Sequence, residues 1–328
     1  MKKRKLGQQG LEVSELGLGC MGMSFAYHLA DETESLKVLD RALELGVTFW
    51  DTAESYGPFK NEELLAKALQ GRRDKVVLAT KVAWKGGKAA PENLDGSPAA
   101  LQKAVEGCLQ RMKTPVIDLL YLHRADPKVP IEDSVGGMAQ LVKQGKVRYL
   151  GLSEVGPNTL RRAHAVHPIS CLQSEYSLWE TSLEEKVLPV LRELGIGLVP
   201  FSPVGRGFLT GAIKSYEDLG PNDMRRNLPR FQGENFKENI KLVEEVTKLA
   251  KTKGATAPQA ALAWLMNQGE DVVPIPGTTK VKHLEENVGT LGINFTDEDF
   301  KAIDAILEKF RVSGARYGEA MAKMVNID

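Results

Sequence analysis

The chain has 328 residues, of which 42% are hydrophobic and 26% charged, an ordinary balance for a globular protein that excludes a disordered, collagen-like or coiled-coil chain. Its 43 Lys and Arg balance 43 Asp and Glu, so the formal net charge is zero. This gives no global field to attract nucleic acid or an anionic membrane, although it leaves room for one local anion site. We therefore expect function to come from a pocket.

Short apolar runs typical of strands alternate along the chain with longer segments whose apolar residues recur at helical spacing. An initial hairpin is predicted from residues 3–6 and 11–13. The predicted strands then cover residues 13–19, 48–50, 76–80, 117–122, 147–152, 171–174, 197–201 and 272–275. The helices predicted to follow them cover residues 35–45, 61–70, 99–112, 134–144, 157–165, 183–194, 237–251 and 283–291.

Strict alternation of strand and helix requires parallel strands joined by right-handed crossovers. An open doubly wound sheet and a closed barrel both satisfy this, but eight units are the number that closes a barrel. The length allows two domains, yet no linker rich in Pro, Gly or Ser divides the chain. We predict an α/β fold, a single (β/α)8 TIM barrel in one domain (1–328), with a hairpin plug (1–13), an inserted cofactor or lid loop after strand seven (203–236) and a C-terminal helix and tail (297–328).

No run of 18 apolar residues occurs, and no apolar segment follows the basic start of the chain. We therefore expect a cytoplasmic protein. The three cysteines, Cys20, Cys108 and Cys171, are odd in number and far apart, which argues against a disulfide framework and a zinc cluster. We expect buried thiols and no bound metal.

The segment Gly17-Leu18-Gly19-Cys20-Met21-Gly22 follows a strand and fits half of the dinucleotide-binding fingerprint, G-x-G-x-x-G. No clear helix opens after it, and no strand ends in an acidic residue about 20 positions later, where that fold binds ribose. The pattern favours a glycine-lined strand end over a Rossmann fold.

In a barrel, catalytic groups lie at the carboxyl ends of the strands. The second predicted strand ends in Asp51, with Tyr56 five residues later, the third ends in Lys81 and the fourth in His123. Each residue also has a purely structural interpretation. Asp51 could cap a turn and Tyr56 could pack between loop and core. Lys81 could form an ordinary ion pair, and His123 could be a hydrogen-bonded residue without a catalytic role. Their occurrence at three successive strand ends favours one shared site.

These four side chains fit a specific chemistry. A phenol with a pKa of about 10 is a poor acid at neutral pH, but an adjacent ammonium such as Lys81 stabilises the phenolate of Tyr56 and lowers that pKa. Asp51 would hold the lysine, and His123 would orient a substrate oxygen. Such a site protonates an oxygen as negative charge develops on it, and reduction of a carbonyl by hydride from a nicotinamide fits this arrangement.

The set Asp51, Tyr56, Lys81 and His123 resembles the catalytic tetrad of the aldo-keto reductases, and the resemblance covers almost the whole chain. Residues 19–22, 151–154 and 161–168 resemble the group of that family that contains perakine reductase and broad-specificity bacterial enzymes. The resemblance implies the barrel fold and NADPH-dependent reduction of aldehydes and ketones. It also implies that Tyr56 is the general acid, that Lys81 and Asp51 tune it, and that His123 positions the carbonyl.

The resemblance implies cofactor contacts as well. Ser153 and Gln173 match positions that bind the nicotinamide carboxamide, and Phe201 matches an aromatic residue, often Tyr, that stacks on the nicotinamide. Glu154 stands at a cofactor position where many members have Asn. The loop expected to wrap the pyrophosphate consists of Ser202, Pro203, Val204, Gly205, Arg206 and Gly207.

A helix start near the end of the chain matches the site for the adenosine 2′-phosphate. Helix N-terminal amides attract anions, and hydroxyl groups and a lysine there suit a phosphate monoester. The resemblance places Thr278, Thr279 and Lys280 around the phosphate, His283 beside it, and Glu286 and Asn287 against the adenine.

Phe25, Tyr27 and Trp84 lie on segments expected to reach the mouth of the barrel, and aromatic walls favour an aromatic or apolar aldehyde. His28 and Arg124 add polarity there. A small ketone, a sugar and a pyridoxal are the alternative substrates that the sequence leaves open. The competing function is a cofactor-binding regulatory or interaction protein on the same barrel with little turnover. The expected partner is a small carbonyl substrate, with no nucleic acid, membrane or obligate protein partner.

Overall fold

The computed structural model describes residues 1–27, 30–325 and 328, so the predicted mouth residue His28 lies outside the described residues. The chain opens with an antiparallel hairpin of β1 (Lys3–Leu6) and β2 (Leu11–Ser14). Seven parallel strands follow, each hydrogen-bonded to the next in chain order: β3 (Leu18–Gly19), β4 (Phe49–Asp51), β5 (Val77–Val82), β6 (Ile117–Leu122), β7 (Val147–Ser153), β8 (Cys171–Glu175) and β9 (Gly197–Phe201).

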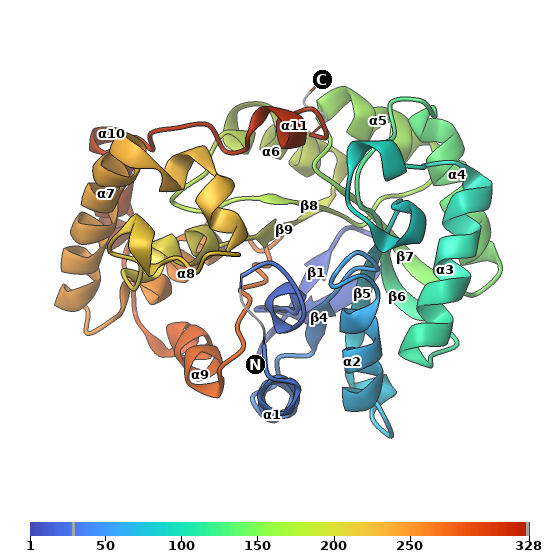
Figure 1. Ribbon diagram of the computed structural model, residues 1–328, viewed down its shortest axis with the longest axis horizontal. Coiled ribbons are helices and arrows are strands. Elements are labelled where there is room, and N and C mark those ends of the chain that lie inside the picture. The colour runs from blue at the N-terminus through green and yellow to red at the C-terminus, as the bar shows by residue number, and fades with distance from the viewer. Residues whose placement is uncertain (28–29, 326–327) are drawn as a thin grey trace.

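Helices surround these strands in the order of the chain, from blue α1 to orange α9 (Figure 1). They are α1 (Glu32–Glu44), α2 (Lys60–Ala68), α3 (Pro98–Met112), α4 (Ile131–Lys143), α5 (Pro157–Val166), α6 (Leu183–Leu194), α7 (Gly233–Thr252), α8 (Ala257–Asn267) and α9 (Val281–Gly289). Helix α10 (Asp297–Lys309) packs on α7, and the short α11 (Glu319–Ala322) lies in the C-terminal tail. Within the described residues, no helix is both long and apolar enough to cross a membrane.

Residues 272–277 run between β9 and β3 and close the barrel. Backbone hydrogen bonds join this segment to both neighbours: Val273 N to Leu198 O, Ile275 N to Pro200 O, Gly17 N to Pro274 O and Gly19 N to Pro276 O. Pro274 and Pro276 have no N–H to donate toward β3, so the ladder on that side is incomplete. The eighth strand is therefore present as isolated parallel bridges, Leu198 with Val272 and Gly19 with Gly277.

The glycines at the start of β3 explain the sequence that resembled a dinucleotide fingerprint. A Cβ atom on Gly17 would lie 2.8 Å from Cγ2 of Ile275, and one on Gly19 would lie 2.8 Å from the Ile275 carbonyl oxygen. These glycines let β3 approach the closing segment, which is the glycine-lined strand end that the sequence favoured.

The hairpin closes the amino-terminal end of the barrel. Leu6, Leu11 and Val13 are buried in one cluster with side chains that alternate along the strands and face inward: Phe49, Ala79, Leu119, Tyr121, Cys171, Val199, Val273 and Ile275. A second, larger cluster lies between the strands and the helices. The predicted (β/α)8 barrel is confirmed, with its hairpin plug, its insertion after the seventh strand and its C-terminal helix.

Helix α8 was not predicted. Its apolar residues do not form one stripe. Seven residues of the helix are buried, and they point in several directions from its axis; Ala257, Ala260, Leu262 and Trp264 are among them. The signal that was present is local: the Thr256 hydroxyl accepts from Gln259 N and the Gln259 side chain accepts from Thr256 N, forming a capping box.

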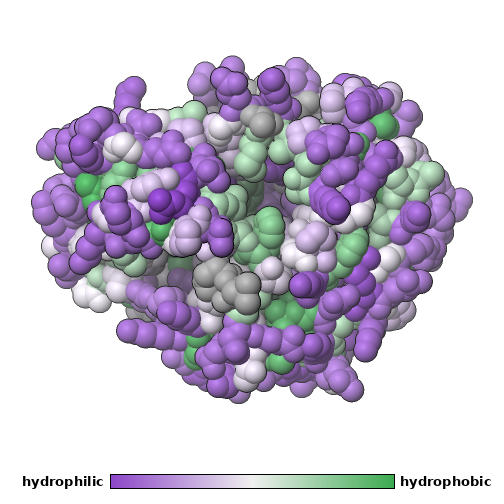
Figure 2. All heavy atoms as spheres, in the orientation of Figure 1, coloured by the Kyte–Doolittle hydropathy of each residue, from purple (hydrophilic) through white to green (hydrophobic). Residues whose placement is uncertain are grey.

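The predicted insertion 203–236 contains short 3-10 turns as far as residue 232: η5 (Gly205–Thr210), η6 (Tyr216–Asp218), η7 (Met224–Asn227) and η8 (Pro229–Phe231). Its last residues, 233–236, already belong to α7. It reaches the loop after β3, since Met224 N donates to Ala26 O at 3.2 Å. Figure 2 shows this face of the molecule. A central hollow is lined mostly by residues of intermediate or high hydropathy, coloured white to green, and its rim is mostly hydrophilic.

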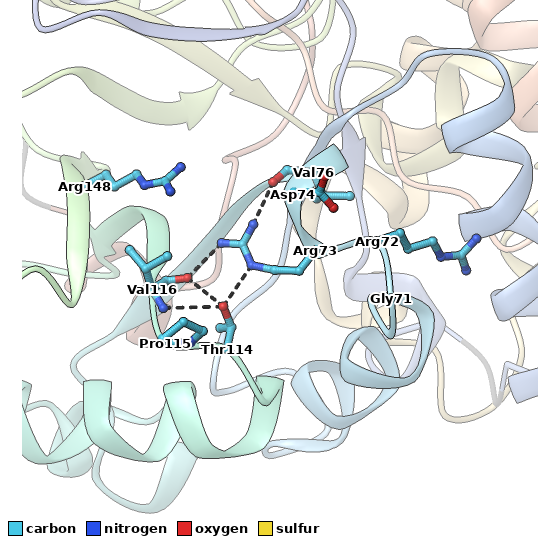
Figure 3. Close-up of a pocket in the computed structure, with 9 residues that line it drawn as sticks. All are labelled: Gly71, Arg72, Arg73, Asp74, Val76, Thr114, Pro115, Val116 and Arg148. Carbon is cyan, nitrogen blue, oxygen red and sulfur yellow. Dashed lines mark hydrogen bonds between the residues drawn. The ribbon is translucent and has the colours of Figure 1, made fainter.

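A separate cavity of about 460 Å³ opens at the opposite, amino-terminal ends of β5, β6 and β7 (Figure 3). Arg73 spans it and donates to the carbonyl oxygens of Val76 and Val116, to the Thr114 hydroxyl and to Asp118. Because the guanidinium of Arg73 is used in these contacts and the cavity lies at the amino-terminal ends of the strands, we assign Arg73 a structural role.

Candidate active site

The alternation that buries the barrel interior also builds the site. Phe49 and Ala79 belong to the inner cluster, and two residues farther along the same strands come Asp51 and Lys81, which therefore face inward one layer above. His123 is the first residue after β6. The structure brings these three predicted side chains to one end of the barrel.

Tyr56 joins them from the loop after β4. The loop turns at Gly57, whose φ is +70° and whose position would put a Cβ atom 2.7 Å from the Ser24 carbonyl oxygen. Only glycine fits both conditions. Phe25 stacks over the Tyr56 ring, with centroids 6.5 Å apart.

Lys81 is 1% exposed, and three oxygen atoms hold its ammonium. Nζ donates to Asp51 Oδ1, to the Thr52 carbonyl oxygen at 2.8 Å and to the Tyr56 hydroxyl at 3.1 Å. Burial alone would lower the pKa of Lys81, but Asp51 and Tyr56 outweigh it and raise the pKa above its usual value. Lys81 is therefore a cation at neutral pH, paired with Asp51.

The lowering effect expected of Lys81 on the pKa of Tyr56 is present, but burial outweighs it. Burial raises the pKa of Tyr56 above its usual value, and the opposing effect of Lys81 only reduces that rise. Desolvation of the phenolate was not visible in the sequence. In the free site Tyr56 is thus a protonated phenol whose hydroxyl contacts a cation.

His123 lies edge-on to two aromatic rings, with centroid distances of 6.1 Å to Tyr56 and 5.9 Å to Trp84. Its Nδ1 is buried without a partner among the described residues. Burial, followed by the charges of Arg124 and Lys81, holds the pKa of His123 well below its usual range. The imidazole is therefore neutral at physiological pH and suits a hydrogen bond rather than proton release.

Gln173 and Ser153 extend the site toward β7 and β8. Their Cα positions are register partners, and both side chains are buried. Gln173 Nε2 donates to Asp51 Oδ2 at 2.8 Å, and the Ser153 hydroxyl accepts from Arg124 Nη1 at 3.0 Å. Gln173 thus contacts Asp51 directly, whereas Ser153 contacts Arg124, the neighbour of His123 in the chain.

Glu154 does not face the site as a free carboxylate. Its Oε1 accepts from Ser174 Oγ and Glu175 N, and its Oε2 pairs with Arg316 from the C-terminal tail. Arg316 Nε also lies 3.6 Å from Glu175 Oε2. Residues 311–318 are therefore fastened over this side of the mouth by buried ion pairs.

The loop after β9 turns sharply where pyrophosphate binding was expected. Ser202, Gly205, Arg206 and Gly207 all have positive φ, between +50° and +88°. Phe201, Ser202, Val204, Arg206 and Gly207 are partly exposed, whereas Pro203 and Gly205 are buried. Arg206 pairs with Glu175 at 2.9 Å and lies over the ring of Tyr317, 5.4 Å from its centroid.

The predicted 2′-phosphate residues lie together at the start of α9. Lys280 is the N-cap residue, and its backbone N–H donates to the Thr278 hydroxyl at 3.1 Å. Lys280 and His283 are exposed, Thr279 and Glu286 are partly exposed, and Thr278 and Asn287 are buried. Of the predicted substrate residues, Tyr27 packs against Arg225, whose guanidinium carbon lies 4.7 Å from the centroid of the tyrosine ring. Trp84 is buried, with 4% of its surface exposed.

Sequence reasoning missed Glu175, Arg316 and Tyr317. Arg316 and Tyr317 belong to the tail, where no periodic pattern or motif marks a contact with the barrel mouth. Glu154 and Arg316 are 162 residues apart in the chain, so only the folded structure shows their pairing.

Comparison with known proteins identifies the family. A model of the aldo/keto reductase family matches residues 15–308. A probable aldo-keto reductase of Glycine max is 46% identical over 315 residues, or 95% of this chain and 91% of the relative. The solved glycerol dehydrogenase of Gluconobacter oxydans is 28% identical with a TM-score of 0.84, over 95% of this chain and 97% of that one. An aldo-keto reductase of Bacillus halodurans, in its holo form, is 29% identical with a TM-score of 0.78, over 98% and 99% of the two chains.

The family match extends over most of the chain, and the relatives align over nearly their whole length with the same barrel. The chain therefore belongs to the aldo/keto reductase family, whose members are oxidoreductases that act on small carbonyl compounds.

Proposed function

We propose that this protein reduces aldehydes and ketones to alcohols with NADPH, and that Tyr56 is the general acid. The observation that carries the proposal is the Tyr56 hydroxyl, 3.1 Å from the ammonium of Lys81, which Asp51 holds in turn. When bound, NADPH supplies the hydride that the carbonyl carbon receives. The protein's own groups then act on the carbonyl oxygen.

In this proposal Tyr56 donates its proton to the oxygen as negative charge develops there. Lys81 stabilises the phenolate that results, and its pairing with Asp51 keeps the ammonium fixed during the transfer. The neutral imidazole of His123 donates one hydrogen bond to the same oxygen and thereby orients the carbonyl. The high pKa of Tyr56 in the free site supports this role, because an acid must be protonated before it acts.

The shape and charge of the mouth support a nicotinamide dinucleotide phosphate. Gln173 and Ser153 would hold the carboxamide, and Phe201 would stack on the ring. Residues 202–207 turn sharply through left-handed backbone conformations, the kind of turn from which anion-binding nests are built, and this shape suits a pyrophosphate. The start of α9, with Thr278, Thr279 and Lys280, would bind the 2′-phosphate, and His283, Glu286 and Asn287 would contact the adenosine.

Glu154 has a different part in the proposal. Because its two carboxylate oxygens are held by Ser174, Glu175 and Arg316, the geometry favours a role in fastening the tail over a direct cofactor contact. The three cysteines are free and buried, which agrees with a reducing, cytoplasmic compartment.

The test combines purified protein, NADPH and a panel of aldehydes, quinones and small polyhydroxy carbonyl compounds, the last because one relative is named a glycerol dehydrogenase. NADPH absorbance should fall with at least one substrate. Tyr56→Phe should lower kcat by about 10²- to 10⁴-fold, the usual contribution of a general acid, while NADPH still binds. Oxidation of NADPH by no compound would favour a cofactor-binding regulatory protein, and full turnover by Tyr56→Phe would remove Tyr56 as the acid.

A further inference from the structure

Arginines are frequent on the segments that follow the carboxyl ends of the strands, and most of them are neutralised. The pairs are Arg206 with Glu175, Arg225 with Asp223, Arg230 with Glu180 and Arg316 with Glu154. Arg124, directly after His123, differs from these. No carboxylate in the described part of the chain lies within 4.0 Å of its guanidinium.

The guanidinium of Arg124 is nevertheless fixed in place. Its Nη1 donates to the carbonyl oxygen of His123 at 2.7 Å and to the hydroxyl of Ser153 at 3.0 Å. Its Nε and Nη2 have no hydrogen-bond partner among the residues that the structure describes, and the side chain is partly exposed. Nε and Nη2 carry the parallel N–H pair of the guanidinium, which matches the two oxygens of a carboxylate.

Electrostatics distinguishes Arg124 from its neighbour Arg206. Burial lowers the pKa of Arg124, whereas Glu175 raises the pKa of Arg206 in spite of burial. An arginine remains a cation in proteins, so Arg124 is a partly buried positive charge that forms no ion pair with a carboxylate of the described residues. A ligand anion would supply that compensation.

The position of Arg124 relates this charge to the reacting groups. It adjoins His123 in the chain and contacts Ser153, whose register partner Gln173 donates to Asp51. The guanidinium therefore lies beside the proposed site of carbonyl reduction, on the side of β6 and β7.

We propose that Arg124 binds a carboxylate of the substrate, so that the protein prefers carbonyl compounds that carry an acid group over their neutral analogues. This inference rests on the proposed function, because it names the substrate class of that site. Arg124 acts by binding and orientation, and the chemical step at the carbonyl is unchanged.

A matched pair of substrates tests the inference: 4-carboxybenzaldehyde and its methyl ester, which differ only in the charged group. We expect wild type to reduce the acid with a kcat/KM about tenfold or more above that of the ester, the range of a charge-assisted hydrogen bond. In Arg124→Met this ratio should fall to about one, and Arg124→Lys should retain part of it. Loss of folding cannot imitate this result, because it lowers both rates together.

Arg225→Met is the matched control, since Arg225 also lies near the mouth but already pairs with Asp223. It should leave the acid-to-ester ratio at its wild-type value. The inference fails if wild type shows no preference for the acid, or if Arg124→Met keeps the preference. It also fails if Arg124→Met weakens NADPH binding and lowers both substrates equally, because Arg124 then serves the cofactor.

Binding without turnover separates this inference from the proposed function. Titration calorimetry with 4-carboxybenzyl alcohol and with the methyl ester of that alcohol should show tighter binding of the acid to wild type and equal binding of both to Arg124→Met. Preferential binding of the acid with no reduction of any aldehyde would overturn the proposed function alone. Reduction of aldehydes with no preference for the acid in rate or binding would overturn the inference alone.

Discussion

Glu54 stands between two proposed catalytic residues in the chain and has a structural part in the site. It is 3% exposed, and its Oε1 accepts hydrogen bonds from the backbone N–H groups of Ala83 and Trp84, both at 3.1 Å. Ala83 has a φ of +138°, a strained value for a residue with a side chain. Glu54 thus stabilises the turn that sets Trp84 against His123.

The protonation of Glu54 gives a pH-dependent stability. Burial raises its pKa from 4.5 to about 7, so the folded state binds the proton more tightly than the unfolded state. Its stabilising contribution is complete below the unfolded pKa and is lost as the pH rises through about 7. As the pH rises from 5 to 8, the free energy of unfolding of wild type should fall by on the order of 2 kcal/mol relative to that of Glu54→Gln, whose side chain cannot titrate.

Urea unfolding of both proteins at several pH values measures this difference. The other titrating groups are common to both, so they cancel in the comparison. Parallel dependence of the unfolding free energy on pH in wild type and Glu54→Gln would show that Glu54 titrates normally in the folded protein.

At the scale of the element, the start of α9 carries the proposed choice of cofactor. Lys280 is exposed at the N-cap, next to the Thr278 hydroxyl and at the positive end of the helix dipole. Lys280→Ala should weaken NADPH binding about tenfold and leave NADH binding nearly unchanged, because only NADPH has the 2′-phosphate. Fluorescence titration with both cofactors measures the two dissociation constants.

Lys282→Ala is the control for Lys280→Ala, since it removes the same charge from an exposed position on the same turn. It should change the preference for NADPH much less. An equal loss of NADPH and NADH affinity in Lys280→Ala would place the 2′-phosphate elsewhere.

The C-terminal tail is fastened to the barrel by side chains rather than by backbone ladders. Arg316 pairs with Glu154 and Glu175, which are both buried. Removing one partner of a buried pair is destabilising by about 3–5 kcal/mol when the other charge stays buried. In Arg316→Met we expect the tail to open instead, with faster amide exchange in residues 311–325 than in the barrel strands.

Hydrogen exchange followed by mass spectrometry tests the tail directly. Arg161→Met is the matched control, because the Arg161–Glu193 pair is exposed on both sides, at 43% and 57%. Because solvent screens this exposed pair, its loss should leave stability nearly unchanged and exchange in residues 311–325 at the wild-type rate. Wild-type exchange rates in the tail of Arg316→Met would contradict the fastening role of these ion pairs.

At the scale of the whole molecule, the parts predicted from sequence are those governed by local periodicity. Strands with period two and helices with period 3.6 define the barrel and its hairpin, and the strand ends then bring Asp51, Lys81 and His123 together. Helix α8 was not predicted because apolar residues lie on nearly every side of it, so its sequence shows no single apolar stripe. The eighth strand was predicted, although its two prolines interrupt the ladder that would define it.

The electrostatics of the site could not be predicted in the same way. The pKa of Tyr56 depends on how deeply the folded chain buries it, and the engagement of Glu154 depends on a tail 162 residues away. The uncompensated charge of Arg124 likewise becomes visible only when its neighbours are known to be paired with carboxylates.

The central claim is that hydride passes from NADPH to a carbonyl carbon within this barrel while the protein protonates the oxygen. The most direct measurement uses NADPH deuterated at both C4 positions of the nicotinamide, with an aldehyde substrate and analysis of the alcohol by mass spectrometry and NMR. Our account predicts one deuterium on the carbinol carbon for each molecule of NADPH consumed. Alcohol without deuterium at that carbon, or consumption of NADPH without alcohol, would contradict it.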